Sequence, residues 1–215
     1  MQTHAVLSCF SHSESWSILS DIERSIRAKI EAVGTPLKDW DIQINYGIKT
    51  GFNDAFIIDS VRRNEILNAC QSEDERQKTA EIIRPILRGR DIKRYCYEWA
   101  ELYIIATFPS RQYDIDNYPT LKEFLLSFGI ERLEQTGKEY IIDGEKVKAR
   151  KKTSNRWFET QDSISYWDEF SKPKIIYPNM TKFLPFAYDT SGLVTNQKCF
   201  IITGKRLAFL TAFLN

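Results

Sequence analysis

The sequence contains little of what most catalytic and metal centres are built from. Its 215 residues include only two histidines, His4 and His12. A histidine-based triad or metal site therefore has poor material here. The four cysteines are far apart and form no CxxC pair, so neither a zinc site nor a disulfide framework is indicated. Reduced thiols in a reducing compartment are the expected state.

Long apolar runs are also missing. The first residues lack the basic start and apolar core of a signal peptide, and no run approaches the length of a membrane span. We therefore expect a cytoplasmic protein with no membrane partner. Hydrophobic residues make up 42% of the chain and aromatic residues 13%, which is enough for a packed core and argues against a disordered chain.

An excess of charge of one sign is also missing, but the charged residues are unevenly distributed along the chain. The formal net charge is only +1, which by itself does not favour a nucleic-acid partner. Cations nevertheless gather in two stretches, 84–94 and 146–156, whereas acids gather elsewhere, as in 73–75. A nearly neutral total is therefore compatible with one basic face.

Hydrophobic periodicity predicts a mixed α/β (α+β) protein. Isoleucines spaced four apart predict a helix over 13–33, capped by Ser13 and ended by Gly34 and Pro36. Pro85 and Gly89 break the periodicity of 84–95, which predicts a loop or bent turn. Further helices are expected over 60–71, 72–83, 118–133, 166–170 and 205–214, and strands over 101–108, 139–143, 174–177, 186–189 and 198–203.

The stretch 37–59 is interpreted as a hairpin. Apolar residues alternate with polar ones up to Tyr46, Gly51 supplies a turn, and a second apolar run follows. The turn would present Lys49, Thr50 and Asn53, a cation, a hydroxyl and an amide suited to phosphates or base edges. The alternative is an ordinary solvated turn.

Arginines and lysines in two later segments suit the same chemistry. Arg88 and Arg90 flank Gly89, and Arg can clamp phosphate or contact guanine with two hydrogen bonds. The alternative is an internal ion pair, for instance of Arg90 or Arg94 with Asp91. The most basic segment runs over 146–157, and its alternative is a solvated loop with Trp157 in the core.

The order of three blocks resembles one known family. The blocks are GIKTGFNDAF over 47–56, PILRGRDIKRY over 85–95, and KIIYP over 174–178 followed by FAYD over 186–189. They are similar to the target-recognition (specificity) domain at the C-terminal end of TaqI-like and Eco57I-like adenine-N6 DNA methyltransferases and fused restriction–modification enzymes. The resemblance implies a twisted, largely antiparallel sheet flanked by helices.

The resemblance also implies a role and its partners. The expected partner is double-stranded DNA, presented to an upstream methyltransferase or nuclease domain of the same polypeptide. The expected domains are a connector helix over 1–36, a target-recognition domain over 37–203 and a docking helix over 204–215. The candidate DNA-binding residues are Lys49, Thr50, Asn53, Arg88, Arg90, Lys93, Arg150, Lys151, Lys152, Asn155, Arg156, Lys182, Thr195 and Asn196. We expect these groups to converge on one concave face.

Catalytic motifs of the resembled enzymes are absent from the sequence. No (D/N/S)PP(Y/F/W) loop and no glycine-rich S-adenosylmethionine loop occurs, so we expect no catalysis and no cofactor in this domain. S-adenosylmethionine, and Mg²⁺ for cleavage, are expected for the parent enzyme. Two alternatives stay open: a compact Mg²⁺-dependent nuclease using Asp143, Glu145 and Lys148, and a module that only docks partner subunits.

Overall fold

The structure is a computed structural model that describes residues 19–142 and 144–215. Contacts divide the chain into two compact units, Met1–Ile42 and Gln43–Asn215. The described part of the first unit contains helix α1 (Asp21–Val33) and the 3-10 turn η1 (Leu37–Asp39). Among the helices described, none is long and apolar enough to cross a membrane.

Helix α1 begins later than the sequence pattern predicts. Ser20 caps it: Glu23 N donates to the Ser20 hydroxyl, and Ser20 N donates to the Glu23 carboxylate over 2.7 Å. This reciprocal pair satisfies free amides of the first turn. The predicted cap at Ser13 lies outside the described residues. The predicted end is confirmed, since Gly34 N donates to Ile30 O over 2.7 Å.

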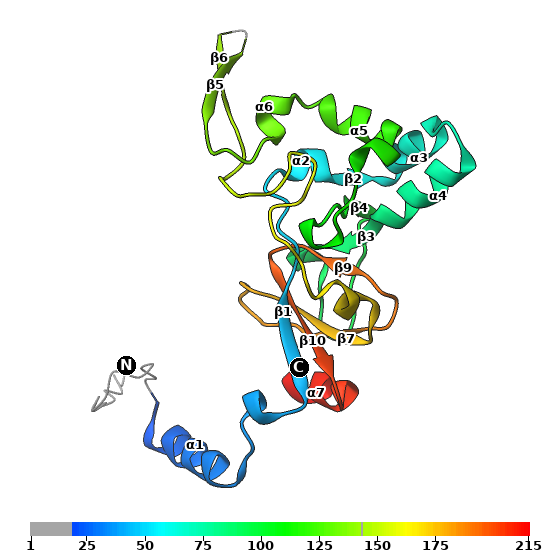
Figure 1. The fold of residues 1–215 in the computed structure, drawn as a ribbon. Coiled ribbons are helices and arrows are strands. Elements are labelled where there is room, and N and C mark those ends of the chain that lie inside the picture. The colour runs from blue at the N-terminus through cyan, green and yellow to red at the C-terminus, as the bar shows by residue number, and fades with distance from the viewer. Residues whose placement is uncertain (1–18, 143) are drawn as a thin grey trace. The chain divides into compact units, whose positions relative to one another are not determined.

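The second unit is a mixture of short strands and short helices (Figure 1). Its helices are α2 (Asn53–Phe56), α3 (Ser60–Ala69), α4 (Glu73–Ile82), α5 (Pro119–Leu126), α6 (Ile130–Leu133) and α7 (Leu207–Leu214), with 3-10 turns η2 (Gly89–Asp91), η3 (Pro109–Arg111), η4 (Ile115–Asn117) and η5 (Trp167–Ser171). Its strands are β1 (Ile42–Tyr46), β2 (Ile57–Asp59), β3 (Ile83–Leu87), β4 (Leu102–Ile105), β5 (Glu139–Ile142), β6 (Glu145–Lys148), β7 (Lys174–Pro178), β8 (Ala187–Asp189), β9 (Val194–Thr195) and β10 (Cys199–Gly204).

The strands form two sheets and a separate ribbon. One sheet has the order β1-β10-β7-β8 and the other β2-β4-β3-β9, while β5 and β6 pair only with each other. Strands β10, β7 and β8 are antiparallel neighbours, as are β2, β4 and β3, and β9 lies parallel to β3. The mixed α/β class and the largely antiparallel pairing are therefore confirmed, with two sheets in place of the expected single sheet.

The predicted hairpin over 37–59 is wrong. Strands β1 and β2 belong to different sheets, and the glycine turn between them carries the chain from one sheet to the other. The apolar run expected as the second strand of the hairpin is divided. Its first two residues, Ala55 and Phe56, belong to the helical turn α2 and are buried in the core beneath the helices. Tertiary packing overrides the local apolar pattern at this point.

Residues 84–87 form a strand, which corrects the loop predicted there. Pro85 lies in the part of β3 that pairs with β4 alone, while Ile86 and Leu87 pair with β9. A proline is tolerated where the strand needs no further amide donor. The predicted loop is confirmed only beyond Leu87, where η2 follows.

The helix predicted over 118–133 is interrupted. Helix α5 begins with Pro119 at its first turn, and Gly129, with φ of 85°, separates it from α6. A positive φ is incompatible with a continuous right-handed helix and is readily adopted by glycine. Leu121 and Leu125 of α5 pack with Leu133 of α6 in one buried cluster, so the break serves the packing.

Two buried clusters hold the second unit together. One joins the two sheets and includes Ile48, Ile86, Ile104 and Ile201. The other lies between β2, β3 and β4 and the helices α3 to α6. Helix α7 belongs to this same unit and contacts β7, β8 and β10.

Candidate nucleic-acid interface

The turn after β1 lies directly beside the segment 195–197. Ile48 N donates to Thr195 O over 2.7 Å, and Gln197 N donates to Ile48 O over 2.8 Å. A Cβ on Gly47 would lie 1.9 Å from Asn196 O, so only glycine allows the two backbones to come this close. The structure thus brings together two of the segments that the sequence analysis selected.

Within the turn, the three predicted contact residues differ in accessibility. Thr50 is buried, and its hydroxyl donates to Asn53 Oδ1 over 2.7 Å and accepts from Phe52 N. Gly51 has φ of 79°, as expected for a tight turn. Asn53 is exposed at the start of α2, and Lys49 is half-buried. Thr50 therefore shapes the turn rather than presenting its side chain to a ligand.

At η2, the side chains of Arg88 and Arg90 have different surroundings. Arg88 donates to Asp91 from its backbone N (2.8 Å), its Nε (3.0 Å) and its Nη2 (2.8 Å). The hydrogen bonds to Asp91 raise the pKa of Arg88. The side chain of Arg90 is exposed and makes no hydrogen bond or ion pair to any residue that the structure describes. Asp91 thus forms its ion pair with Arg88, and not with Arg90 or Arg94 as the alternative supposed, which leaves Arg90 available.

These segments surround one hollow of about 600 Å³. Asn53 reaches it from α2, Arg88 and Arg90 from η2, and Asn196 and Lys198 from the turn before β10. The loop after β7 closes it with Asn179, Met180 and Thr181. Cations and amides from four separate segments therefore line a single concavity, which is the arrangement that contacts to phosphates and base edges require.

Two residues at this hollow escaped the sequence analysis. Lys198 is exposed, and its backbone N donates to Asn196 Oδ1 over 3.1 Å, which fixes the turn that carries both side chains. Asn179 N donates to Lys198 O over 2.8 Å and ties the loop after β7 to the same turn. The available signal for Lys198 was its position two residues after Asn196, at the start of the strand predicted over 198–203.

Three further predicted contacts have different positions. Lys93 is exposed, and its Nζ lies 3.8 Å from Glu98. Lys182 is exposed in the loop after β7, with its Nζ 5.3 Å from the centre of the Phe183 ring. Thr195 is fully buried in β9, which corrects its prediction as a contact residue, because a β9 side chain inside the core cannot reach a ligand.

The basic segment 150–156 is divided between interior and surface. Arg150 is buried, and its guanidinium donates to Leu133 O over 2.7 Å and to Thr50 O over 3.0 Å. The Asn155 amide donates to Thr160 O and Gln161 O. Arg150 and Asn155 therefore hold the loop together, which corrects Arg150 as a surface contact.

The exposed part of this segment does not line the basic hollow. Lys151, Lys152 and Arg156 are exposed. Arg156 and Asn155 line a separate hollow of about 770 Å³ that also contains Asp114 and Glu159. Its mixed charge fits a polyanion less well than the 600 Å³ hollow does. The expected convergence thus holds for Asn53, Arg88, Arg90 and Asn196, and not for Asn155 and Arg156.

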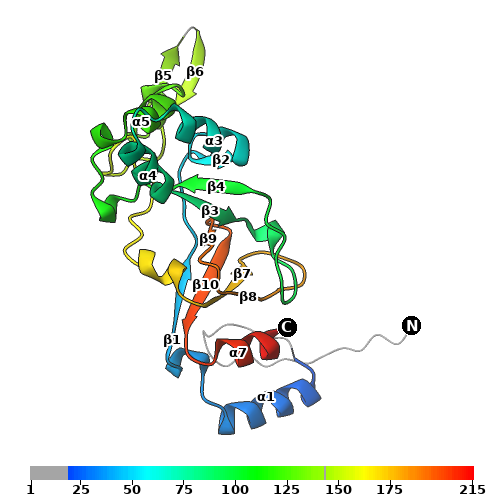
Figure 2. The same ribbon diagram turned by 90° about the vertical axis from the view of Figure 1, so that its right-hand side faces the viewer.

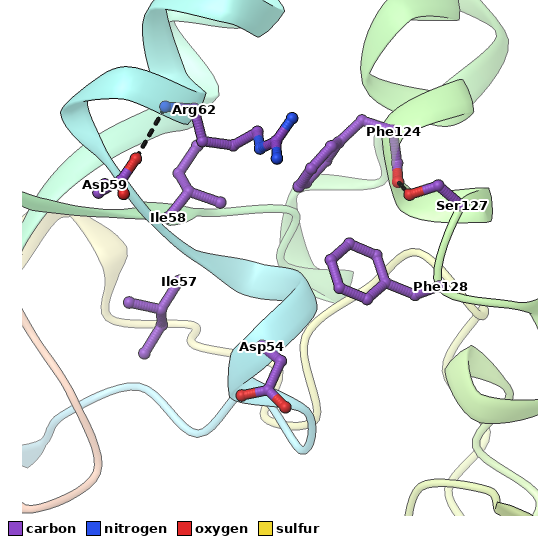
Figure 3. A pocket seen from close by; sticks show the side chains of 8 residues that line it. All are labelled: Asp54, Ile57, Ile58, Asp59, Arg62, Phe124, Ser127 and Phe128. Atoms are coloured by element: carbon purple, nitrogen blue, oxygen red, sulfur yellow. Dashed lines mark hydrogen bonds between the residues drawn. The ribbon is translucent and has the colours of Figure 1, made fainter.

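A third and smaller hollow, of about 330 Å³, lies beside α2 and the start of α3 (Figure 3). Arg62 and the rings of Phe124 and Phe128 line it, together with the carboxylates of Asp54 and Asp59. Asp59 caps α3 by accepting from Arg62 N over 2.8 Å. Its two carboxylates make this hollow unsuited to phosphate.

The residues of the nuclease alternative do not converge where they are described. Glu145 and Lys148 lie three apart in β6, so their side chains point to opposite faces of the ribbon. Asp143 lies outside the described residues. No cluster of three or more metal-ligating His, Cys, Asp or Glu side chains occurs within 19–142 and 144–215.

The comparisons with known proteins agree with this geometry. A family model described as the TaqI-like C-terminal specificity domain matches residues 84–215, more than half of the chain. The chain therefore belongs to the family of TaqI-like C-terminal specificity domains. The resemblance based on the three blocks is thereby confirmed for the two blocks inside this range, while the block over 47–56 precedes it.

A solved structure has a similar fold. It is the Type IIL restriction–modification enzyme MmeI in complex with DNA, with a TM-score of 0.51 and 11% sequence identity. The match covers 84% of this chain and 21% of that chain, so this chain spans about a fifth of the length of that relative. No curated protein matches this chain.

Proposed function

We propose that this specificity domain reads a short sequence of duplex DNA through the hollow lined by Asn53, Arg90, Asn196 and Lys198. The supporting observation is the convergence of these four side chains from three segments on one concavity. Arginine and lysine supply salt-dependent affinity for phosphates, and amides supply paired hydrogen bonds to adenine. The family membership supports DNA as the partner.

Arg90 is the residue on which this proposal depends most. Arg88 is held by the buried carboxylate of Asp91, which fixes the backbone of η2. Gly89 lies between the two arginines, and a Cβ there would come within 3.1 Å of Lys198 O. The turn is therefore packed closely against 198, and Arg90 projects from a rigid base. A rigid base lowers the entropy lost when the guanidinium binds.

The first experiment selects bound duplexes from a random pool with the 215-residue chain. Enrichment of one sequence supports target recognition, and recovery of an unselected pool contradicts it. The selected duplex is then titrated with Arg90→Ala and with the control Arg76→Ala. Arg76 is an exposed arginine of α4 whose Nη1 lies 3.4 Å from Glu73. The control is expected to bind as the wild type does.

The result for Arg90→Ala also shows whether Arg90 contacts a base or a phosphate. Loss of a base contact weakens binding to the selected duplex by about 1–3 kcal/mol and relaxes the preference at one position. Loss of a phosphate contact weakens binding to all duplexes alike and lowers the salt slope by about 1. Unchanged affinity for every duplex would remove Arg90 and its hollow from the interface.

The catalytic partner is part of the same proposal. A chain without a described metal cluster and without a methyltransferase loop would act on DNA only through a domain elsewhere in its polypeptide. We assign that domain as an adenine-N6 methyltransferase, a type II endonuclease or both, with S-adenosylmethionine, and Mg²⁺ for cleavage, as its cofactors. By holding one half of the duplex, the specificity domain would help the target base leave the stack. The sequence upstream of this chain tests the assignment directly.

A further inference from the structure

The β5–β6 ribbon presents one solvent-exposed face. Ile141 pairs with Lys146 and Glu139 with Lys148, and cross-strand partners share a face. All four side chains are exposed, and Ile141 is 76% exposed. Both views show the ribbon projecting from the helices of the second unit (Figure 1 and Figure 2). The ribbon thus carries an open face with two lysines around an isoleucine.

The opposite face of the ribbon is held by the body of the unit. Tyr140 and Val147 are half-buried, and the Tyr140 hydroxyl donates to Glu134 over 2.8 Å. A two-stranded ribbon is marginally stable in water when it packs against nothing. The contact at Tyr140 therefore fixes which face turns outward, and the open face carries the lysines.

The base of the ribbon is connected to the proposed DNA interface through buried hydrogen bonds. Ala149 N donates to Lys138 O over 2.9 Å and Gly137 N donates to Arg150 O over 2.8 Å, so the ladder continues beyond the strands. Arg150 in turn donates to Thr50 O over 3.0 Å. The Thr50 hydroxyl donates to Asn53, which lines the 600 Å³ hollow. The base of the ribbon is thus linked through hydrogen bonds to one residue that lines that hollow.

The charge around the open face defines the chemistry of its partner. Exposed cations on the ribbon and its base outnumber the exposed carboxylates Glu139 and Glu145: they are Lys138, Lys146, Lys148, Lys151 and Lys152. A two-stranded β-ribbon fits the major groove of B-form DNA. Lysines on one face of such a ribbon can reach phosphates on either side of the groove, with an apolar side chain between them.

We propose that the ribbon is an arm that lies along duplex DNA next to the target sequence, with Lys146 and Lys148 contacting phosphates and Ile141 facing the groove. The inference rests on the proposed function, because it extends the footprint of the same interface. The arm adds affinity without adding sequence preference, since phosphate contacts carry no direct sequence information. Its occupant is the flanking duplex.

The test compares the double variant Lys146→Ala/Lys148→Ala with the wild type across salt concentrations. The slope of log K against log[salt] is negative, and each lost phosphate contact reduces its magnitude by about 0.9, so the double variant should lose about 1.8 in magnitude. Between 50 and 200 mM salt, the fold-loss of affinity should then be about twelve times smaller for the double variant than for the wild type. The sequence selected from a random pool should stay the same.

The matched control removes two lysines from helices of the same unit, Lys78→Ala/Lys122→Ala. Both control lysines have an acidic partner, Asp74 for Lys78 and Asp116 for Lys122, each within 2.6 Å. The control changes the net charge by the same amount and should leave the slope within a few tenths of the wild-type value. If the magnitude of the slope falls equally for both double variants, the salt dependence reflects net charge rather than contacts of the arm, and the inference is overturned.

Duplex length separates the arm from the hollow. The wild type should bind the target better when the duplex extends beyond it, and the arm variant should lose this advantage. If the wild type selects no sequence at all, the proposed function fails. If it selects a sequence but the arm variant keeps the wild-type slope and length dependence, the arm inference fails and the proposed function stands.

Discussion

The Nη1 atom of Arg150 lies 3.0 Å from the backbone oxygen of Thr50, although a hundred residues separate the two in sequence. The same guanidinium also donates to the backbone oxygens of Leu133, Trp157 and Glu159. Burial lowers the pKa of Arg150 to about 10, with an opposing effect of Glu159, so the group is charged at neutral pH. One buried cation thereby closes the turn that begins the interface.

Replacing Arg150 by lysine should destabilise the fold even though the charge is kept. A lysine cannot direct donors to four carbonyls, and each buried acceptor left without a partner costs about 1–3 kcal/mol. We expect Arg150→Lys to lower the free energy of unfolding by about 3 kcal/mol in urea titrations. The exposed neighbour Lys151→Ala should change it by no more than about 0.5 kcal/mol. A stable Arg150→Lys protein would show that these hydrogen bonds do not hold the turn.

Asp91 should matter more for folding than for contact with DNA. It is 5% exposed and accepts three hydrogen bonds from Arg88, one of them from the backbone. Asp91→Ala leaves these donors unpaired, and we expect a loss of about 2 kcal/mol by chemical denaturation. The exposed Asp116, paired with Lys122, is the control and should cost less than about 1 kcal/mol when changed to alanine. Equal losses would contradict the structural role of Asp91.

The stability provided by the ion pair between β7 and β8 should depend on pH. Lys174 and Asp189 form an ion pair with both side chains fully buried. Burial alone would raise the pKa of Asp189, but hydrogen bonds from Lys174 and Ser191 outweigh it and hold the pKa below 3.8. A carboxylate with a lowered pKa stabilises the fold above its unfolded value, and this stability is lost as the pH falls through the lower folded value.

Asp189→Asn tests this dependence. At pH 7 the variant leaves Lys174 buried without its counter-ion, and we expect a loss of about 3 kcal/mol in unfolding free energy. The difference from the wild type should shrink as the pH falls below 3.8, the unfolded reference value. A difference that is constant from pH 7 to pH 3 would assign the loss to packing rather than to the charge.

Two glycines should respond differently to the same substitution. A Cβ on Gly47 would lie 1.9 Å from a backbone oxygen, so Gly47→Ala must separate the turn from 195–197. A Cβ on Gly144 would meet nothing within 4 Å, and Gly144→Ala should cost only the strain of its φ of 83°, about 1–2 kcal/mol. We expect Gly47→Ala to cost more than Gly144→Ala in thermal unfolding and to weaken DNA binding as well. Equal effects would show that the chain can move apart at Gly47 without cost.

Helices with strong local signals were predictable from sequence. The acidic start of α4 after Ser72, the cap of α3 by Asp59 and the proline at the start of α5 all lie within a residue or two of the predicted bounds. These signals are local, because capping and proline effects involve residues within one turn. The strand β3 was missed because Pro85 and Gly89 suggest a loop, and only pairing with β4 and β9 makes it a strand.

For the interface, the sequence by itself determined which segments carry cations and amides, and the order of its blocks determined the family. Only the tertiary structure decided which of those side chains are accessible: it placed Arg90 at the surface and Arg150 in the interior, although Arg150 belongs to the more basic of the two segments. The reason is physical. Composition sets how many charges a segment has, but burial depends on contacts between residues as far apart as Thr50 and Arg150, and no local pattern records those contacts.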